Sequence, residues 1–132
     1  MKGLLIAAIL AASLPVTVAA APKPSEVESD LDACLSAPTG ASTAGQIACI
    51  EADLKVQDGL MNRNYAAAMK RLNPRQQGKL RAAQRAWIAY RDAECQAQYD
   101  EDWGTLSRVN ANFCVLRMTS VRASQLAEYP EQ

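Results

Sequence analysis

The chain has 132 residues, 49% of them hydrophobic, and its 14 basic and 14 acidic residues give a formal net charge of zero. This length fits one domain with a modest core. The balanced charge argues against nucleic acid as a partner of the whole chain. The absence of histidine excludes Ser-His-Asp and Cys-His catalytic sites as well as His-ligated metals.

Residues 1–20 have the pattern of a secretory signal peptide. Lys2 precedes an apolar run over residues 4–14, and this run is too short to span a bilayer. Small residues at positions 18 and 20 predict cleavage after Ala20. We therefore expect a periplasmic or secreted mature chain, a single domain over residues 21–132 with a mobile leader at 21–25 and no membrane span. The alternative is that the apolar run stays as a membrane anchor.

Two capping boxes predict where the first two helices begin. Ser25 with Glu28 opens a short helix that continues through Cys34 and Leu35, and the Pro-Thr-Gly run at 38–40 ends it. Thr43 with Gln46 opens a long helix. The apolar positions of this second helix recur at near-heptad spacing and are Ile47, Ile50, Leu54, Met61, Tyr65, Ala68 and Leu72.

Two further helices follow, joined by the turn at residues 100–104. Asn73 as N-cap and Pro74 at the first helical position start the third helix, which runs to about Tyr99. Thr105 is the expected cap of the fourth, whose apolar positions are Leu106, Val109, Phe113, Leu116, Val121 and Leu126. No stretch of the sequence shows a pattern that predicts a β-strand. The fold class is therefore all-α, an antiparallel three-helix up-down-up bundle with a short N-terminal helix over one end.

Four cysteines in an exported chain of this size predict two disulfides. If cysteines on either side of the same turn bond to each other, the pairs are Cys34–Cys49 and Cys95–Cys114. The pairing Cys49–Cys95 with Cys34–Cys114 stays open as an alternative. A zinc site is the rival explanation, but the sequence has no CxxC pair.

The third helix places polar side chains on an inward face. Leu80, Gln84, Trp87, Arg91 and Cys95 recur at spacings of three and four. Hairpin geometry then predicts the facing pairs Asp58–Arg91, with Thr119 nearby, Gln84–Tyr65 and Trp87–Arg122. Buried polar groups are usually paired, so we expect these residues to fix helix register rather than to line a ligand pocket.

The motifs resemble the LprI-like N-terminal domain family of small exported bacterial domains. The matching residues include Asp58-x-x-Met61-Asn62-x-x-Tyr65, Gln84-Arg85-x-Trp87-x-x-Tyr90-Arg91-Asp92-x-x-Cys95, Gly104-Thr105 and Thr119-x-x-Arg122-x-x-x-Leu126. Trp103 departs from the family, where glycine is expected. The resemblance implies an all-helical, disulfide-bonded envelope protein, and one named member is described as an inhibitor of host lysozyme. It supplies no catalytic residue.

Charges are segregated along the chain, and this predicts where a partner binds. Residues 59–91 include eight basic side chains and no acidic one, whereas residues 92–102 include five acidic side chains and no basic one. The acidic run ends in Trp103, between Cys95 and Cys114 in the sequence. We therefore expect a contact tip for a basic protein partner made of Asp100, Glu101, Asp102 and Trp103.

The function expected from the sequence is that of an exported, non-enzymatic binding module, without cofactor or metal, that inhibits a lysozyme-type cell-wall hydrolase. No recognisable set of acid, base and nucleophile supports an enzyme. The alternative is a structural or stress-related envelope protein that binds another envelope component.

Overall fold

The computed structural model describes residues 24–129, with side chains from residue 30 onward. This part of the chain contains α1 (Pro24–Ser36), η1 (Pro38–Ala41), α2 (Thr43–Arg71), α3 (Pro74–Ala97), η2 (Glu101–Trp103) and α4 (Thr105–Ala127), and no strand. The predicted signal peptide, most of the predicted leader and the side chains of the first capping box lie outside the described residues.

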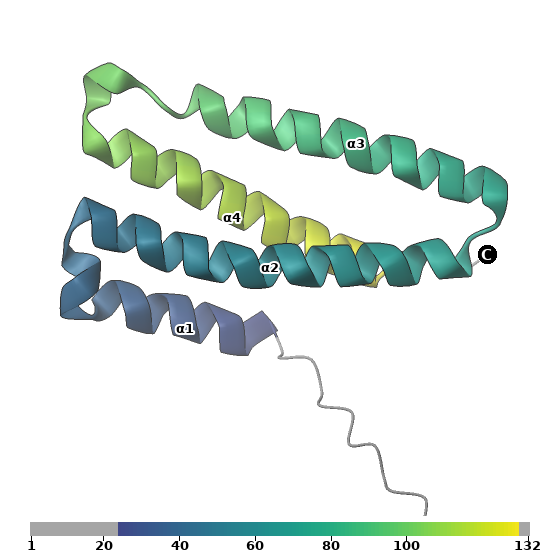
Figure 1. Cartoon of the computed structure of the whole chain (residues 1–132), viewed down its shortest axis with the longest axis horizontal. Helices are drawn as coiled ribbons and strands as arrows, with labels where there is room; N and C mark the ends of the chain where they lie inside the picture. Colours follow the sequence, from purple (N-terminus) through teal and green to yellow (C-terminus); the bar gives the residue numbers. More distant parts are fainter. Residues whose placement is uncertain (1–23, 130–132) are drawn as a thin grey trace, which may run out of the picture.

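The three long helices run antiparallel in an elongated bundle (Figure 1). α4 packs along α2, and α3 lies against α4 with fewer close approaches. α1 folds back along the first part of α2, so that η1 and η2 lie at the same end of the molecule (Figure 1). The predicted up-down-up bundle with a short N-terminal helix is thus confirmed.

The turn between α2 and α3 is built as predicted. The side chain of Asn73 accepts a hydrogen bond from Gln76 N at 3.1 Å, and Pro74 occupies the first turn of α3. Gln77 Nε2 donates to the carbonyls of Met69 and Leu72, at 2.9 and 3.0 Å. The Met69 carbonyl also accepts from Leu72 N at 3.4 Å, so the Gln77 side chain adds to the backbone bond that ends α2.

Two other predicted caps, at Thr43 and Thr105, are wrong by one residue. Ser42, not Thr43, caps α2, and its hydroxyl accepts from Gly45 N at 3.0 Å. Gly104, not Thr105, is the N-cap residue of α4. The two threonines instead begin their helices, and their hydroxyl oxygens lie 3.3 Å apart. They therefore link the first turns of α2 and α4.

Both predicted disulfides are confirmed. Cys34 is bonded to Cys49 with a Cα–Cα distance of 5.8 Å, and Cys95 to Cys114 with 5.4 Å. The alternative pairing and the zinc site are therefore wrong, since all four thiols are consumed. The bonds tie α1 to α2 and α3 to α4.

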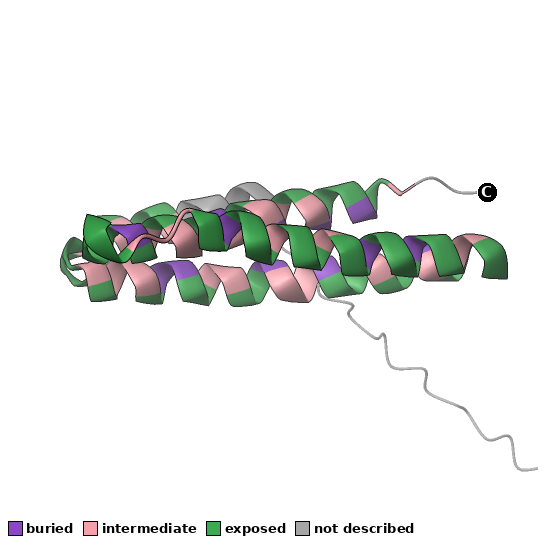
Figure 2. Cartoon of the chain, turned by 90° about the horizontal axis from the view of Figure 1, so that it is seen from above, coloured by how far each residue is buried: buried purple, intermediate pink, exposed green. Residues whose placement is uncertain are grey.

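The hydrophobic core lies between α2 and α4, with α3 contributing little. Its buried members are Met61, Ala68, Leu72, Leu80, Ala123 and Leu126. In α3 the buried positions are Leu80, Gln84 and Cys95, and the rest of the helix is largely exposed (Figure 2). No helix in the described part of the chain is long and apolar enough to cross a membrane.

The apolar positions predicted for α4 are only partly buried. Leu116 and Leu126 are in the interior, whereas Leu106, Phe113 and Val121 are 60%, 44% and 53% exposed. The buried positions of α4 also include the small or polar residues Thr119 and Ala123, each 0% exposed. Several of the apolar side chains of α4 thus remain at the surface.

Candidate partner-binding site

The turn between α3 and α4 carries the exposed acidic tip. The tip is the segment Asp100 to Trp103, and Trp103 is 71% exposed. Glu101 and Asp102 are also exposed, while Asp100 is half-buried. The carboxylate of Asp100 accepts a hydrogen bond from Asp102 N at 2.9 Å. Two of the three predicted acids are thus available to a partner, and the third has a structural bond to maintain.

Three features hold the tip in one conformation. The Cys95–Cys114 disulfide spans its base. Ser107, only 1% exposed, donates from its hydroxyl to the carbonyl of Asp100 at 2.7 Å and lies 2.9 Å from the carbonyl of Gly104. Gly104 itself has φ 72° and ψ −163°, a backbone conformation essentially confined to glycine. A preorganised contact surface loses less conformational entropy when it binds.

A hollow of about 370 Å³ lies beside Trp103, between the end of α3 and α4. Trp103, Phe113 and Arg117 line it, and the Cys114 end of the disulfide lies at its wall. Arg117 also lines a second hollow of about 240 Å³, together with Trp87 and Val121. The two hollows both lie against α4 and share the exposed Arg117; we call the one beside Trp103 the groove.

The structure corrects the predicted register between α2 and α3. Asp58 does not pair with Arg91: its carboxylate accepts from Asn62 at 3.0 Å, one turn along the same helix. Arg91 instead donates to Asp92, at 2.7 and 2.9 Å. Tyr65 packs against the hydrophobic core and is not the partner of Gln84.

The predicted register between α3 and α4 is correct. Arg91 Nη1 donates to Thr119 Oγ1 at 3.2 Å. Trp87 lies between two arginines, with the Cζ atoms of Arg91 and Arg122 at 5.3 and 5.8 Å from its ring centroid. Arg122 Nε donates to Gln84 Oε1 at 2.9 Å, and burial lowers the pKa of Arg122. These residues satisfy one another and hold α3 on α4.

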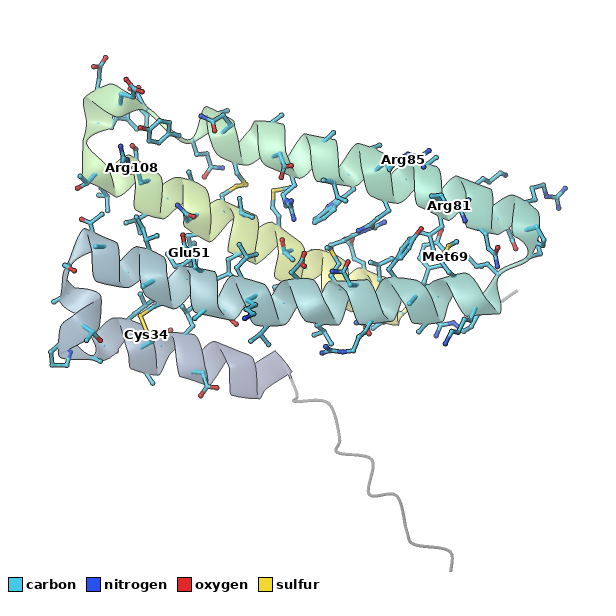
Figure 3. All side chains as sticks on the ribbon, in the orientation of Figure 1. Cys34, Glu51, Met69, Arg81, Arg85 and Arg108 are labelled. Atoms are coloured by element: carbon cyan, nitrogen blue, oxygen red, sulfur yellow. A yellow bond between two sulfur atoms is a disulfide. The ribbon has the colours of Figure 1, made fainter. Side chains whose placement is uncertain are left out.

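Acidic side chains of α1 and α2 lie at the same end of the molecule as the tip. In Figure 3 Glu51 marks this end of α2. Burial is the main reason that the pKa of Asp53 is raised; Asp30 on α1 raises it further, against a lowering by the hydrogen bond from Gln57. Asp30 and Asp53 thus bring like charges to the neighbouring helices α1 and α2. A negative potential at this end would attract a basic partner.

Sequence reasoning missed the residues that support the tip. Ser107 has no motif that distinguishes it from other serines, so only the folded turn reveals its two hydrogen-bond contacts. The sequence pattern predicts Phe113 in the core and indicates no role for Arg117. The signal that could have found them is the spacing of Leu106, Phe113 and Arg117, which marks a face of α4 distinct from that of Leu116 and Leu126.

Comparison with known proteins identifies the family. Residues 34–126 match the family model described as "Lysozyme inhibitor LprI". The chain is similar to the protein named "Uncharacterized protein R02472" of Rhizobium meliloti (strain 1021), with 30% identity over 97 residues that cover 63% of this chain and 70% of the relative. No solved structure matches. Because the family match runs from the first cysteine to the last core leucine of α4, the chain belongs to the LprI lysozyme inhibitor family.

Proposed function

We propose that this chain is an exported, non-catalytic binding module that inhibits a lysozyme-type cell-wall hydrolase through its acidic tip. The observation that carries the proposal is Trp103, which is 71% exposed and rimmed by carboxylates on a turn that a disulfide closes. A rigid, exposed tryptophan is a typical interface anchor. The two disulfides favour an oxidising compartment, where such a hydrolase is met.

The groove beside the tip supplies the apolar part of this interface. Trp103 and Phe113 lie in the same hollow, so a partner that covers the tryptophan also buries the phenylalanine. Acidic residues at the rim speed the encounter with a basic partner and add specificity more than affinity. We therefore assign affinity to the aromatic pair and rate of association to Glu101 and Asp102.

The test compares a tip variant with a matched control. Glu101→Ser/Asp102→Ser/Trp103→Ala leaves Asp100 in place because its carboxylate bonds to the turn backbone. Asp58→Ser/Glu128→Ser/Tyr90→Ala removes the same numbers of acids and exposed aromatic residues elsewhere. We expect the purified wild-type chain and the control to slow the lysis of cell walls by a basic lysozyme, and the tip variant to fail with its melting temperature nearly unchanged.

Salt and direct binding complete the test. Inhibition should weaken as ionic strength rises, since exposed charges are screened over about 10 Å at 0.1 M salt. Equal inhibition by the tip variant and the wild type would rule out the tip. Tip-dependent capture of another envelope protein, without slower lysis, would support the alternative of an envelope-binding protein.

A further inference from the structure

The end of the molecule opposite the tip carries an unusual concentration of positive charge. Six cations lie on the last turns of α2 and the first half of α3, on both sides of the turn at Asn73. All six are exposed, and they are Arg63, Lys70, Arg75, Lys79, Arg81 and Arg85. We call this set the basic end. Figure 3 shows Arg81 and Arg85 on α3 toward this end, whereas Glu51 and Arg108 lie toward the other.

The charges of the basic end are not neutralised within the described residues. None of the six makes an ion pair there; the ion pair that α3 does form joins Arg91 to Asp92. The sequence has no acidic residue over 59–91 or over 103–127, so neither the α2–α3 hairpin nor α4 supplies one. Among the described residues, Glu128, just beyond α4, is an acidic residue that the packing of α4 brings toward this end.

Helix stability does not explain these positions. Lys70 near the end of α2 is favoured by the negative end of the helix dipole. Arg75 stands in the first turn of α3, where that dipole disfavours a cation, and Lys79 and Arg81 follow in the second turn, where the dipole gives them no support. No acid compensates in the first turn of α3. The three residues therefore add a positive field that the fold does not need.

We propose that the basic end docks on an anionic lipid surface. The cations are distributed over α2 and α3 on both sides of the turn at Asn73, at one end of the elongated bundle (Figure 1), which fits an extended array of negative headgroups better than a single small anion. Clusters of four to eight lysines and arginines are typical of attachment to anionic lipids, at about 1 kcal/mol per cation near the surface. The proposed attachment is electrostatic and peripheral.

Docking by this end would orient the molecule. The acidic residues of the tip and of the η1 end are repelled by the same surface, so the long axis stands away from it. The 24 residues of α3 then place the tip about 35 Å above the headgroups, at 1.5 Å per residue. The docking itself does not depend on what the tip binds.

The experiment measures binding of the purified chain to vesicles by sedimentation. Vesicles of equal parts phosphatidylglycerol and phosphatidylcholine are compared with vesicles of phosphatidylcholine alone. Binding to the neutral vesicles would report insertion of apolar side chains. The test variant is Arg75→Gln/Lys79→Gln/Arg81→Gln. The control, Arg117→Gln/Lys55→Gln/Arg108→Gln, removes the same residue types and the same charge from exposed positions outside the basic end.

We expect binding to the anionic vesicles, little to the neutral ones, and loss of binding as salt rises. The test variant should bind about a hundredfold more weakly, from about fivefold per cation, and the control within about threefold of the wild type. Equal weakening of the two variants, or no binding to anionic vesicles at low salt, would overturn the proposal. So would release by millimolar inorganic phosphate, which indicates a small-anion site, or equally tight binding to duplex DNA.

Discussion

Arg122 and Gln84 join α4 to α3 through a hydrogen bond of 2.9 Å between Nε and Oε1. Gln84 is only 8% exposed, and its amide nitrogen lies 3.5 Å from Met61 Sδ on α2. One buried glutamine thus contacts both helices that face α3. Since α3 has few buried residues of its own, this contact is central to how the helix is held.

Replacing Gln84 with leucine should destabilise the fold. The substitution keeps the side-chain volume but leaves the guanidinium of Arg122 without its acceptor on α3, and hydrogen bonds to charged groups are worth about 1.5–3 kcal/mol. We expect a decrease of this size in the free energy of unfolding, measured by urea denaturation. Gln96→Leu makes the same change at an exposed position of α3 and should stay within about 0.5 kcal/mol. Equal midpoints for the two variants would contradict the role of Gln84.

Removing the Arg91 side chain should lower the free energy of unfolding by less than breaking a buried ion pair does. Its partner Asp92 has a side chain that is 58% exposed and can return to water, and Thr119 keeps its bond to the carbonyl of Val115 at 2.7 Å. The losses are a hydrogen bond and the contact with Trp87, so we expect Arg91→Ala to lower the unfolding free energy by about 1–2 kcal/mol. The matched variant Arg81→Ala should be nearly neutral. A loss above about 3 kcal/mol, as for a broken buried pair, would show that Arg91 has another partner.

Two glycine-to-alanine substitutions should change the stability of the fold in opposite directions. At Gly104 no atom lies within 4 Å of an added Cβ, yet φ is 72°, so the cost of Gly104→Ala is backbone strain of about 1–3 kcal/mol. Gly78 lies inside α3, and an added Cβ also meets nothing, so Gly78→Ala should stabilise by about 0.4–1 kcal/mol. Thermal unfolding measures both. A stabilised Gly104→Ala variant would mean that the tip can adopt another turn.

The raised pKa of Asp53 predicts a pH-dependent effect of replacing it with asparagine. A carboxyl group whose pKa is higher in the folded state favours folding when protonated, and this contribution is lost as pH rises through the folded-state pKa. Asp53→Asn should therefore be slightly more stable than the wild type at neutral pH. The difference should shrink as pH falls through the folded-state pKa and vanish below 3.8, the ordinary pKa of the carboxyl, where Asp53 is protonated in both the folded and the unfolded state. An advantage of the variant that persists unchanged at low pH would point to a cause other than ionisation.

Sequence reasoning succeeded where short-range chemistry decides the structure. Asn73 and Pro74 define a turn by themselves, and each disulfide joins residues on either side of one turn. The Cys95–Cys114 bond also fixes the alignment of α3 with α4, so the pairs Arg91–Thr119 and Trp87–Arg122 follow from counting along two helices.

The errors arise where a third helix changes the geometry. The pairs Asp58–Arg91 and Gln84–Tyr65 assumed that α2 and α3 pack directly on each other, whereas α4 is the main neighbour of both. Gln84 reaches α2 at Met61, one turn from Tyr65. In α4, apolar residues occupy two faces, and periodicity alone cannot tell which face is covered. The groove beside the tip could be recognised only once Phe113 was seen to be exposed.

The positions of the disulfides also determine how the chain responds to proteolysis. Within residues 24–129 three connections join four α-helices, and disulfides span two of these connections, the one at η1 and the one at the tip. A protease that cuts the exposed tip leaves both fragments covalently joined, and the cut becomes visible on a gel only after reduction. The connection at Leu72 and Asn73 has no such bridge. Of the three connections, this is the one where a single cut separates the molecule into two pieces.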